Sequence, residues 1–209
     1  FNVTGCTDDL KAFKAFLSGV GEQDKKYLFP KYWDFSIVDT YSEITVDPSS
    51  EEFKEICELF NNGFDNGQVS KLTRIQNNTL FRNYIDTIYS RTVVGPDLLK
   101  NRKMLFHGTR MNKPSSIFKH SDIGFDMEKA NSTSKYGKGL YFAASASYSH
   151  QYTHTTGFGT YQMLLADVYI GVSHYKRPGA SFRVLTADQD SLHTHENVFV
   201  LFQNSQSYP

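Results

Sequence analysis

The chain has 209 residues, the length of one domain, and its 39% apolar and 15% aromatic content excludes wholesale disorder. Lys and Arg number 22, as do Asp and Glu, so the formal net charge is zero. A protein that binds nucleic acid normally carries a basic excess, so we expect no nucleic-acid partner for this domain alone.

Residues 1–29 are predicted to be a lead segment or the tail of an upstream module. In this segment, Thr7 is a candidate N-cap for a helix that ends near Gly19. Three apolar positions would share one face of that helix: Leu10, Phe13 and Leu17. Strand-like residues follow at 32–34 and 41–46, and Asp47-Pro48 ends the second run.

A helix is predicted next, because Ser49 and Glu52 have the spacing of a capping box. It should stop at residues 61–63, Asn-Asn-Gly, and its apolar face consists of Phe53, Ile56, Cys57 and Phe60. Residues 69–76 alternate imperfectly as a strand. A second amphipathic helix follows, marked by Leu80, Phe81, Tyr84, Ile85 and Ile88.

The stretch 104–109 reads as an apolar strand that ends in His107, followed by the uncovered backbone of Gly108. The span from His107 to Tyr141 is rich in loops, and its apolar anchors are Ile117, Phe118 and residues 123–126. Residues 127–136 are polar and have no hydrophobic period.

A second informative stretch is predicted to be a strand over 140–143 and a helix over 144–152. The helix would carry Ser145, Ser149 and Tyr152 on one face. If it packs back on the strand, Tyr141 and Tyr152 can flank a flat slot with Ser149 at its edge. Such a slot suits a planar aromatic amide, which needs two stacking faces and a hydroxyl partner.

Two further strands are predicted, at 163–171 and 198–202, the first buried on both faces. Residues 173–190 between them read as a long connection, and connections of that length are usually functional or mobile.

The ordered set His107-Gly108-Thr109, Tyr141-Phe142-Ala143, Ser149 and Tyr152 resembles the catalytic domain of the poly(ADP-ribose) polymerase family. Tyr141 follows His107 by 34 positions, and the resemblance covers residues 30–209. It implies an α+β ADP-ribosyltransferase fold of two packed, mainly antiparallel sheets with flanking helices around an NAD cleft. The runs 31–33 and 74–77 resemble the mono-ADP-ribosyltransferase subgroup with upstream zinc-finger and WWE modules.

The resemblance also implies roles for site residues. His107 and Tyr141 would be catalytic, with His107 holding a ribose hydroxyl of NAD. Gly108 and Ser149 would bind the carboxamide, Tyr141 and Tyr152 would sandwich the nicotinamide ring, and Thr109 would touch the adenosine side. Residues 127–136 match the position of the family's donor loop, so the expected cofactor contacts are Gly108, Thr109, Ser149, Tyr152 and Tyr136.

The function implied is an NAD-dependent transferase that attaches ADP-ribose to acceptor proteins, itself included, and releases nicotinamide. A catalytically silent interaction module in a larger protein stays open as the alternative. The resemblance puts the third catalytic residue on a strand past Tyr208-Pro209, so we expect that C-terminal strand to be missing from this chain. Residues 198–209 contain no acidic residue, which together with the subgroup resemblance favours transfer of single units.

Other readings of the sequence are weaker. Lys138 lies between two glycines but lacks the spacing of a phosphate-binding loop. The pairs His150/His154 and His193/His195 have no acidic or cysteine ligand cluster, so no metal is expected. The two cysteines form no CxxC pair and are expected to be reduced. There is no signal-peptide pattern and no apolar run long enough for a membrane span, so we expect an intracellular location, cytoplasmic or nuclear, and no membrane partner.

Overall fold

The structure is a computed structural model of the chain. It describes residues 21–37, 39–65, 67–91, 100–119, 122–157, 159–177 and 189–209, together with residues 15, 18 and 19. The apolar face predicted for the lead helix, with its Thr7 cap, lies outside the described residues.

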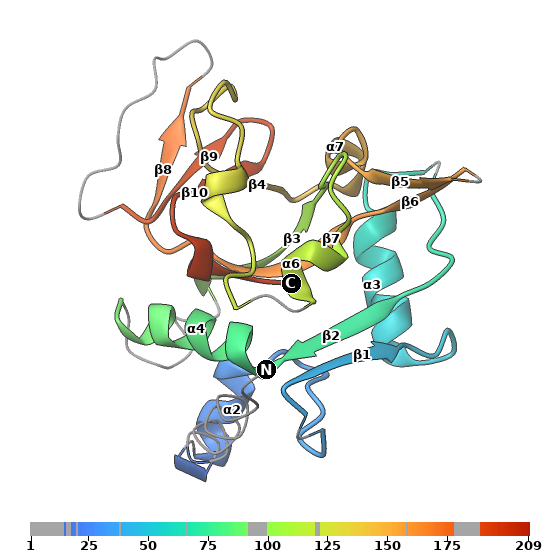
Figure 1. Ribbon diagram of the computed structural model, residues 1–209, viewed down its shortest axis with the longest axis vertical. Coiled ribbons are helices and arrows are strands. Elements are labelled where there is room, and N and C mark those ends of the chain that lie inside the picture. Colours follow the sequence, from blue (N-terminus) through green and yellow to red (C-terminus); the bar gives the residue numbers. More distant parts are fainter. Residues whose placement is uncertain are drawn as a thin grey trace, which may run out of the picture.

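A seven-stranded sheet organises the molecule, in the order β11-β7-β3-β4-β10-β9-β8 (Figure 1). Its neighbours are antiparallel except for the parallel pair β8–β9. The strands are β3 (Arg102–His107), β4 (Leu140–Ala143), β7 (Leu164–Tyr169), β8 (Ser173–Lys176), β9 (Ser191–Thr194), β10 (Val198–Leu201) and β11 (Ser207–Tyr208).

Two small antiparallel sheets accompany the large one. They pair β1 (Tyr41–Thr45) with β2 (Thr73–Asn77), and β5 (His154–Gly157) with β6 (Thr160–Gln162). The predicted α+β class with mainly antiparallel strands is confirmed. The seven strands of the main sheet are hydrogen-bonded neighbour to neighbour and form one continuous sheet, so they are not divided between two large sheets.

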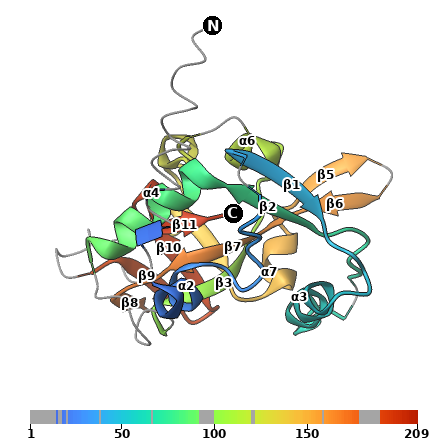
Figure 2. The same cartoon turned by 90° about the horizontal axis from the view of Figure 1, so that it is seen from below.

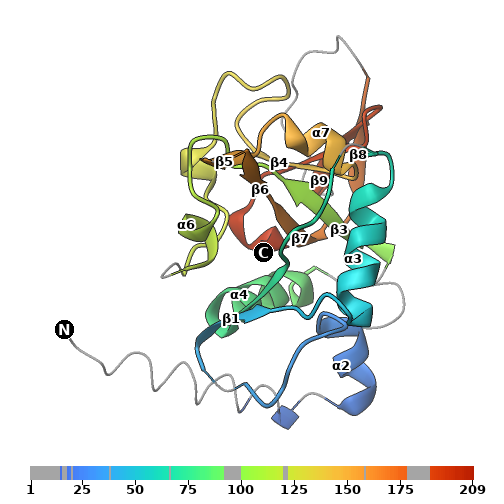
Figure 3. The same ribbon diagram turned by 90° about the vertical axis from the view of Figure 1, so that its right-hand side faces the viewer.

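Short helices flank the main sheet. In Figures 1 and 3, α4 and α7 lie on opposite sides of it. Figure 2 shows α6 beside β1, where the ring of Tyr41 stacks on Phe118 at 6.4 Å. The helices are α2 (Glu22–Leu28), α3 (Glu51–Asn61), α4 (Asn78–Tyr89), α6 (Ser115–Phe118) and α7 (Ala146–His150), with 3-10 turns η1 (Met127–Lys129) and η2 (Asn204–Gln206).

The predicted helix α4 is confirmed, and it supplies the centre of the core. Its apolar stripe is fully buried: Phe81, Tyr84, Ile85 and Ile88. The side chain of Asn77 caps the helix by accepting a hydrogen bond from the backbone N–H of Leu80, at 3.0 Å. Tyr208 packs against Phe81, and its hydroxyl donates to the carbonyl of Ile75 and accepts from the N–H of Asn77.

Helix α2 packs on the same core through Leu28, which is fully buried. Arg102, the first residue of β3, donates to the carbonyl oxygens of Tyr27 and Leu28. The same guanidinium forms a buried ion pair with Asp167 of β7, and that carboxylate also accepts from the hydroxyl of Tyr84, at 2.8 Å. One polar cluster therefore joins α2, α4 and two central strands.

Several predicted boundaries near the start of the domain need correction. Residues 32–34 form no strand, because the N–H of Trp33 closes a turn on the carbonyl of Pro30. The strand predicted over 69–76 is shorter and later, at β2, because β1 offers only five partners. The prediction of α3 is confirmed, but its cap is Ser50, whose hydroxyl accepts from the N–H of Phe53 at 3.2 Å.

Ser49 cannot serve as that cap, because Asp47 already engages it. The Asp47 carboxylate accepts from both the backbone N–H and the hydroxyl of Ser49, each at 2.8 Å. This Asx turn delays the start of the helix by one residue.

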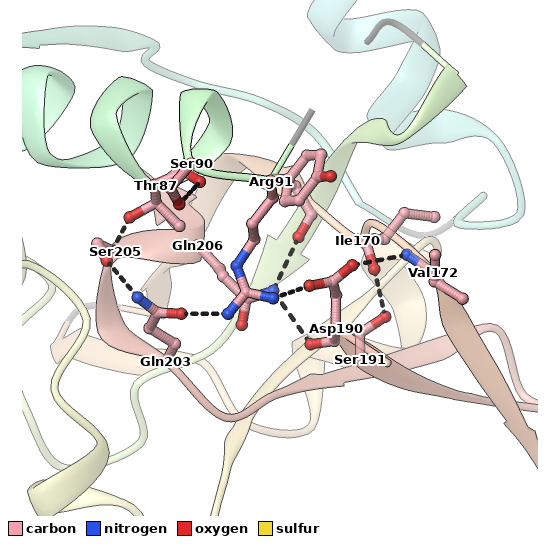
Figure 4. Close-up of polar contacts among 11 residues, drawn as sticks. Thr87, Ser90, Arg91, Ile170, Val172, Asp190, Ser191, Gln203, Ser205 and Gln206 are labelled. Atoms are coloured by element: carbon pink, nitrogen blue, oxygen red, sulfur yellow. Dashed lines mark hydrogen bonds and ion pairs between the residues drawn. The ribbon is translucent and has the colours of Figure 1, made fainter. Parts of the chain in front are cut away.

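The region predicted as one long connection contains strand β8, and β9 follows it. Figure 4 shows the polar clamp at the base of both strands. Asp190 accepts from the N–H of Val172 at 2.9 Å and pairs with the guanidinium of Arg91, at the end of α4. Arg91 also donates to Gln203 at 2.9 Å. The clamp therefore fixes the far end of the sheet against α4 and η2. Residues 178–188 of the connection lie outside the described residues.

Candidate active site

His107 and Tyr141 are brought together by the adjacent strands β3 and β4. The Nδ1 atom of His107 lies 2.7 Å from the carbonyl oxygen of Tyr141. A carbonyl oxygen only accepts, so Nδ1 carries the proton and Nε2 is left as an acceptor. The imidazole lies against the rings of Phe125 and Phe142, and this burial lowers its pKa. A neutral imidazole with a fixed tautomer can accept a hydrogen bond from a sugar hydroxyl.

Gly108 follows His107 at a point where no side chain fits. A Cβ there would lie 2.4 Å from the backbone carbon and oxygen of Tyr152, and 2.8 Å from the carbonyl oxygen of Ser149. The glycine lets the end of β3 approach the end of α7. Hydrogen bonding of its backbone to a small planar amide stays a prediction.

The phenol of Tyr141 is fastened to the turn that precedes its own strand. Its hydroxyl donates to the carbonyl of Gly137 at 2.8 Å and accepts from the N–H of Tyr136 at 2.9 Å. Gly137 has φ +91°, a conformation that glycine adopts without strain. Burial raises the pKa of Tyr141, so the phenol stays protonated and its ring keeps one position.

The segment expected to be the donor loop, residues 127–136, is held to the rest of the protein at two points. The N–H of Met127 donates to the side chain of Asn204 at 2.8 Å. Lys138 pairs with Glu128 at 2.9 Å, and the ammonium of Lys135 lies 3.4 Å from the carboxylate of Glu196. The contacts of Met127 and Lys135 hold this segment against η2 and against the turn between β9 and β10, whereas the pair of Lys138 and Glu128 is local to the loop.

Ser149 is buried on α7, where its hydroxyl donates to the carbonyl of Phe106 at 3.0 Å. Its proton is therefore used within the protein, and its lone pairs can accept from the NH₂ group of an amide. The helix predicted over 144–152 is shorter than expected. Ser145 takes the extended N-cap conformation and Tyr152 lies past the C-cap, so only Ser149 of the predicted face is helical.

Tyr152 stands in a turn, where its N–H donates to the carbonyl of Ser149 at 2.9 Å. Its ring lies 5.9 Å from that of Tyr148, at an angle of 50°. The guanidinium carbon of Arg110 lies 4.6 Å from the centroid of the same ring. The structure thus brings Gly108, Ser149 and Tyr152 together, while the sandwich of a nicotinamide ring between Tyr141 and Tyr152 stays a prediction.

The other two expected cofactor contacts are engaged inside the protein. The hydroxyl of Thr109 donates to the carbonyl of Asn112 at 2.6 Å. Tyr136 is 3% exposed and belongs to an apolar cluster with Leu192 and Val200, against which Tyr141 packs. Tyr136 therefore packs where it can support Tyr141. Direct contacts of Thr109 and Tyr136 with NAD stay predictions.

Val198, the first residue of β10, lies on the strand next to that of Tyr141. Val198 pairs with Ala143 across the ladder, and Val200 pairs with Tyr141. Because paired residues and alternate residues share a face of an antiparallel sheet, Val198 and Tyr141 face the same side. The face of β10 that Tyr141 shares is therefore apolar at Val198, and a third catalytic residue past Pro209 stays a prediction.

The histidine pairs show other contacts in the structure. The ring of His150 packs between Phe64 and Tyr161, and His154 bonds to the carbonyl of Arg110. Within the described ranges, no group of three or more His, Cys, Asp or Glu side chains gathers as a metal site. Over the same part of the chain, no helix has the length and apolarity to cross a bilayer.

Comparison with known proteins gives consistent similarities. The family model of the poly(ADP-ribose) polymerase catalytic domain matches residues 50–191. A probable poly [ADP-ribose] polymerase of Dictyostelium discoideum is 34% identical over 193 residues, covering 87% of this chain and 56% of that protein. Protein mono-ADP-ribosyltransferase PARP12 of Homo sapiens is 32% identical over 193 residues, and the mouse protein is 30% identical over 190. Each covers 86% of this chain, and this chain spans 27% and 26% of their lengths.

Proposed function

Because the chain belongs to the family of poly(ADP-ribose) polymerase catalytic domains, we propose that it transfers single ADP-ribose units from NAD to protein side chains. The observation that carries the proposal is His107, whose Nδ1–H is bonded to the Tyr141 carbonyl so that Nε2 is an acceptor, directly before Gly108, which has no side chain. Enzymes of this family use NAD as co-substrate, and nicotinamide is the product released.

Breaking the bond between nicotinamide and ribose requires no proton donor from the protein. The bond between the ribose carbon and the pyridine nitrogen breaks, and its electron pair returns to the ring, which leaves as neutral nicotinamide. The ribose carbon becomes oxocarbenium-like, as in glycoside hydrolysis. An acceptor side chain then bonds to that carbon and gives up a proton. The protein's task is to orient both reactants and to support charge at the reacting carbon.

Each site residue has a part in that task. Gly108 and Ser149 would hold the carboxamide, and Tyr141 and Tyr152 would stack on the ring, which is cationic before cleavage. His107 would accept a hydrogen bond from a ribose hydroxyl and so orient the sugar. Because such an orientation matters most at the transition state, loss of His107 should lower turnover more than binding.

The composition of residues 198–209 supports transfer of single units over chain growth. Elongation requires a carboxylate that polarises a hydroxyl of the previous ribose. Residues 198–209 contain no acidic side chain that could take this part. The resemblance to mono-ADP-ribosyltransferases favours the same outcome.

Incubation with labelled NAD tests the proposal. We expect a discrete increase of one ADP-ribose mass per modified site, on the protein itself or on acceptor proteins, and loss of that label in His107→Gln. The melting temperature of the variant should stay within a few degrees of the wild type. A heterogeneous high-mass product would contradict transfer of single units. Tight NAD binding with no transfer and no nicotinamide release would favour the silent interaction module instead.

The acceptor proteins, automodification and the intracellular location stay predictions. Fractionation of cells, followed by recovery of labelled proteins from the cytoplasm and nucleus, would examine them together.

A further inference from the structure

Arg110 has an uncommon backbone conformation directly after the His107-Gly108-Thr109 stretch. Its φ is +52°, in the left-handed region that residues with a Cβ rarely adopt. Among described residues other than glycine, only Asn197 shares a positive φ, and asparagine tolerates it better. Such conformations persist where the surroundings enforce them, which is frequently at functional sites.

The surroundings that enforce it are all near Tyr152. The backbone N–H of Arg110 donates to the carbonyl of Tyr152 at 2.7 Å. The Nδ1 atom of His154, two residues further on, lies 2.9 Å from the carbonyl of Arg110 and donates to it. The exposed guanidinium lies over the Tyr152 ring, with its carbon 4.6 Å from the centroid. One residue therefore holds both the backbone and the ring of Tyr152.

We propose that Arg110 is a positioning residue, which holds the Tyr152 ring as one wall of the nicotinamide slot. This rests on the proposed function. Tyr152 lies past the C-cap of α7, so no helical hydrogen-bond ladder beyond it fixes its orientation. Fixing the orientation of an aromatic ring when a ligand binds costs free energy and so reduces affinity. A cation that already lies over the ring removes part of that cost before binding.

A direct contact between Arg110 and NAD would make a different prediction. An exposed guanidinium is also well suited to phosphate oxygens, so Arg110 could bind the diphosphate of NAD instead. The two roles separate with nicotinamide itself, which occupies the slot but carries no phosphate.

The test is to measure Kd for NAD and for nicotinamide by calorimetry in wild type, Arg110→Gln and Arg110→Lys. Positioning through Tyr152 predicts that Arg110→Gln weakens both ligands by the same factor, roughly two- to fivefold, the size of an exposed cation–π contact. Arg110→Lys keeps a cation and should recover most of the loss. The weaker binding in Arg110→Gln should appear as a higher KM for NAD. The kcat for nicotinamide release should change by less than about twofold.

Arg82→Gln is the matched control, since Arg82 is a partly exposed arginine on α4, and it should leave both Kd values unchanged. If Arg110→Gln fails to fold, Arg110→Gly replaces it, because glycine accepts the positive φ and removes the side chain. Loss of NAD affinity with nicotinamide unaffected would overturn the proposal in favour of a diphosphate contact. Unchanged affinity for both ligands would overturn it outright. If the wild type bound neither ligand, the proposed function itself would fail.

Discussion

Single residues at this site act mainly by fixing the protonation and the orientation of their neighbours. The Tyr141 carbonyl sets the tautomer of His107, and the turn at Gly137 sets the ring of Tyr141. Gly108 contributes by having no side chain, which permits contact between two loops. Each effect comes from the backbone, so it depends on the strands being in register.

The partly buried imidazole of His107 should make stability depend on pH. Burial holds the pKa of His107 below its ordinary value of about 6.5, while in the unfolded chain it is near that value. Above that pH both states are neutral and His107 contributes nothing to the dependence. As pH falls below about 6.5, the unfolded state binds the proton first, so the free energy of unfolding decreases. Wild type should therefore lose stability between pH 7 and pH 5, and His107→Gln should lose less.

Urea unfolding at pH 7, 6 and 5 measures this. His193 needs a parallel variant, since burial and the nearby His174 and Lys103 also lower its pKa. His193→Gln should reduce the change of unfolding free energy with pH by a separate amount. Identical pH slopes for wild type and His107→Gln would show that the imidazole is not buried as described.

At the scale of elements, short helices depend on their caps more than on their length. Helix α3 has 11 residues and no fully buried side chain, so packing alone gives it limited support. Its start is fixed by the Asx turn at Asp47 and by the cap at Ser50. Two acidic residues, Glu51 and Glu52, then lie in the first turn, where the helix dipole favours them.

Ser50→Ala should cost about 1 kcal/mol in the free energy of unfolding, the usual value for a lost N-cap. Ser49→Ala is the matched control. We expect it to reduce the free energy of unfolding by less, because the Ser49 hydroxyl makes an exposed hydrogen bond to the Asp47 carboxylate. Chemical denaturation of both variants decides between the two serines. A larger loss in Ser49→Ala would restore the cap first predicted from the sequence.

The sequence predicted the elements that have a strong hydrophobic period. Helix α4 and strands β4, β7 and β10 follow from their apolar patterns, and the pair His107 and Tyr141 follows from its motif. The hairpin β5–β6 was missed because both strands are mostly exposed, so their residues show no alternation. Strand β8 was missed because Ser-His-Tyr-Lys lacks an apolar period, and Arg110 because its role depends on a backbone angle.

At the scale of the molecule, one polar cluster connects helix α2 with the centre of the sheet. The side chains of Arg102 and Asp167 are only 7% and 8% exposed. Arg102 also reaches two carbonyl oxygens at the end of α2, and Tyr84 brings in α4. Strand β3, which begins at Arg102, ends at His107, so the cluster anchors the strand that presents the site.

Removing one partner of this pair should be strongly destabilising. Arg102→Met leaves the buried carboxylate of Asp167 with the Tyr84 hydroxyl as its one remaining side-chain donor among the described residues, and we expect a loss of about 3–5 kcal/mol. Lys103→Met, the next residue on the strand but exposed, should change stability by no more than about 0.5 kcal/mol. The double variant Arg102→Met with Asp167→Leu should lose less than Arg102→Met alone. A fully additive result in denaturation would show that the two charges are not coupled.

Tyr208 also sets a condition on how the domain forms during synthesis. Its buried ring packs on Phe81, and its hydroxyl bonds to backbone groups 131 and 133 residues earlier in the chain. At ribosomal speeds of 5–20 residues per second, β2 waits roughly 7 to 27 s for this partner to be made. During that interval the apolar stripe of α4 lacks part of its cover. This part of the core therefore cannot be completed during synthesis before Tyr208 has been made.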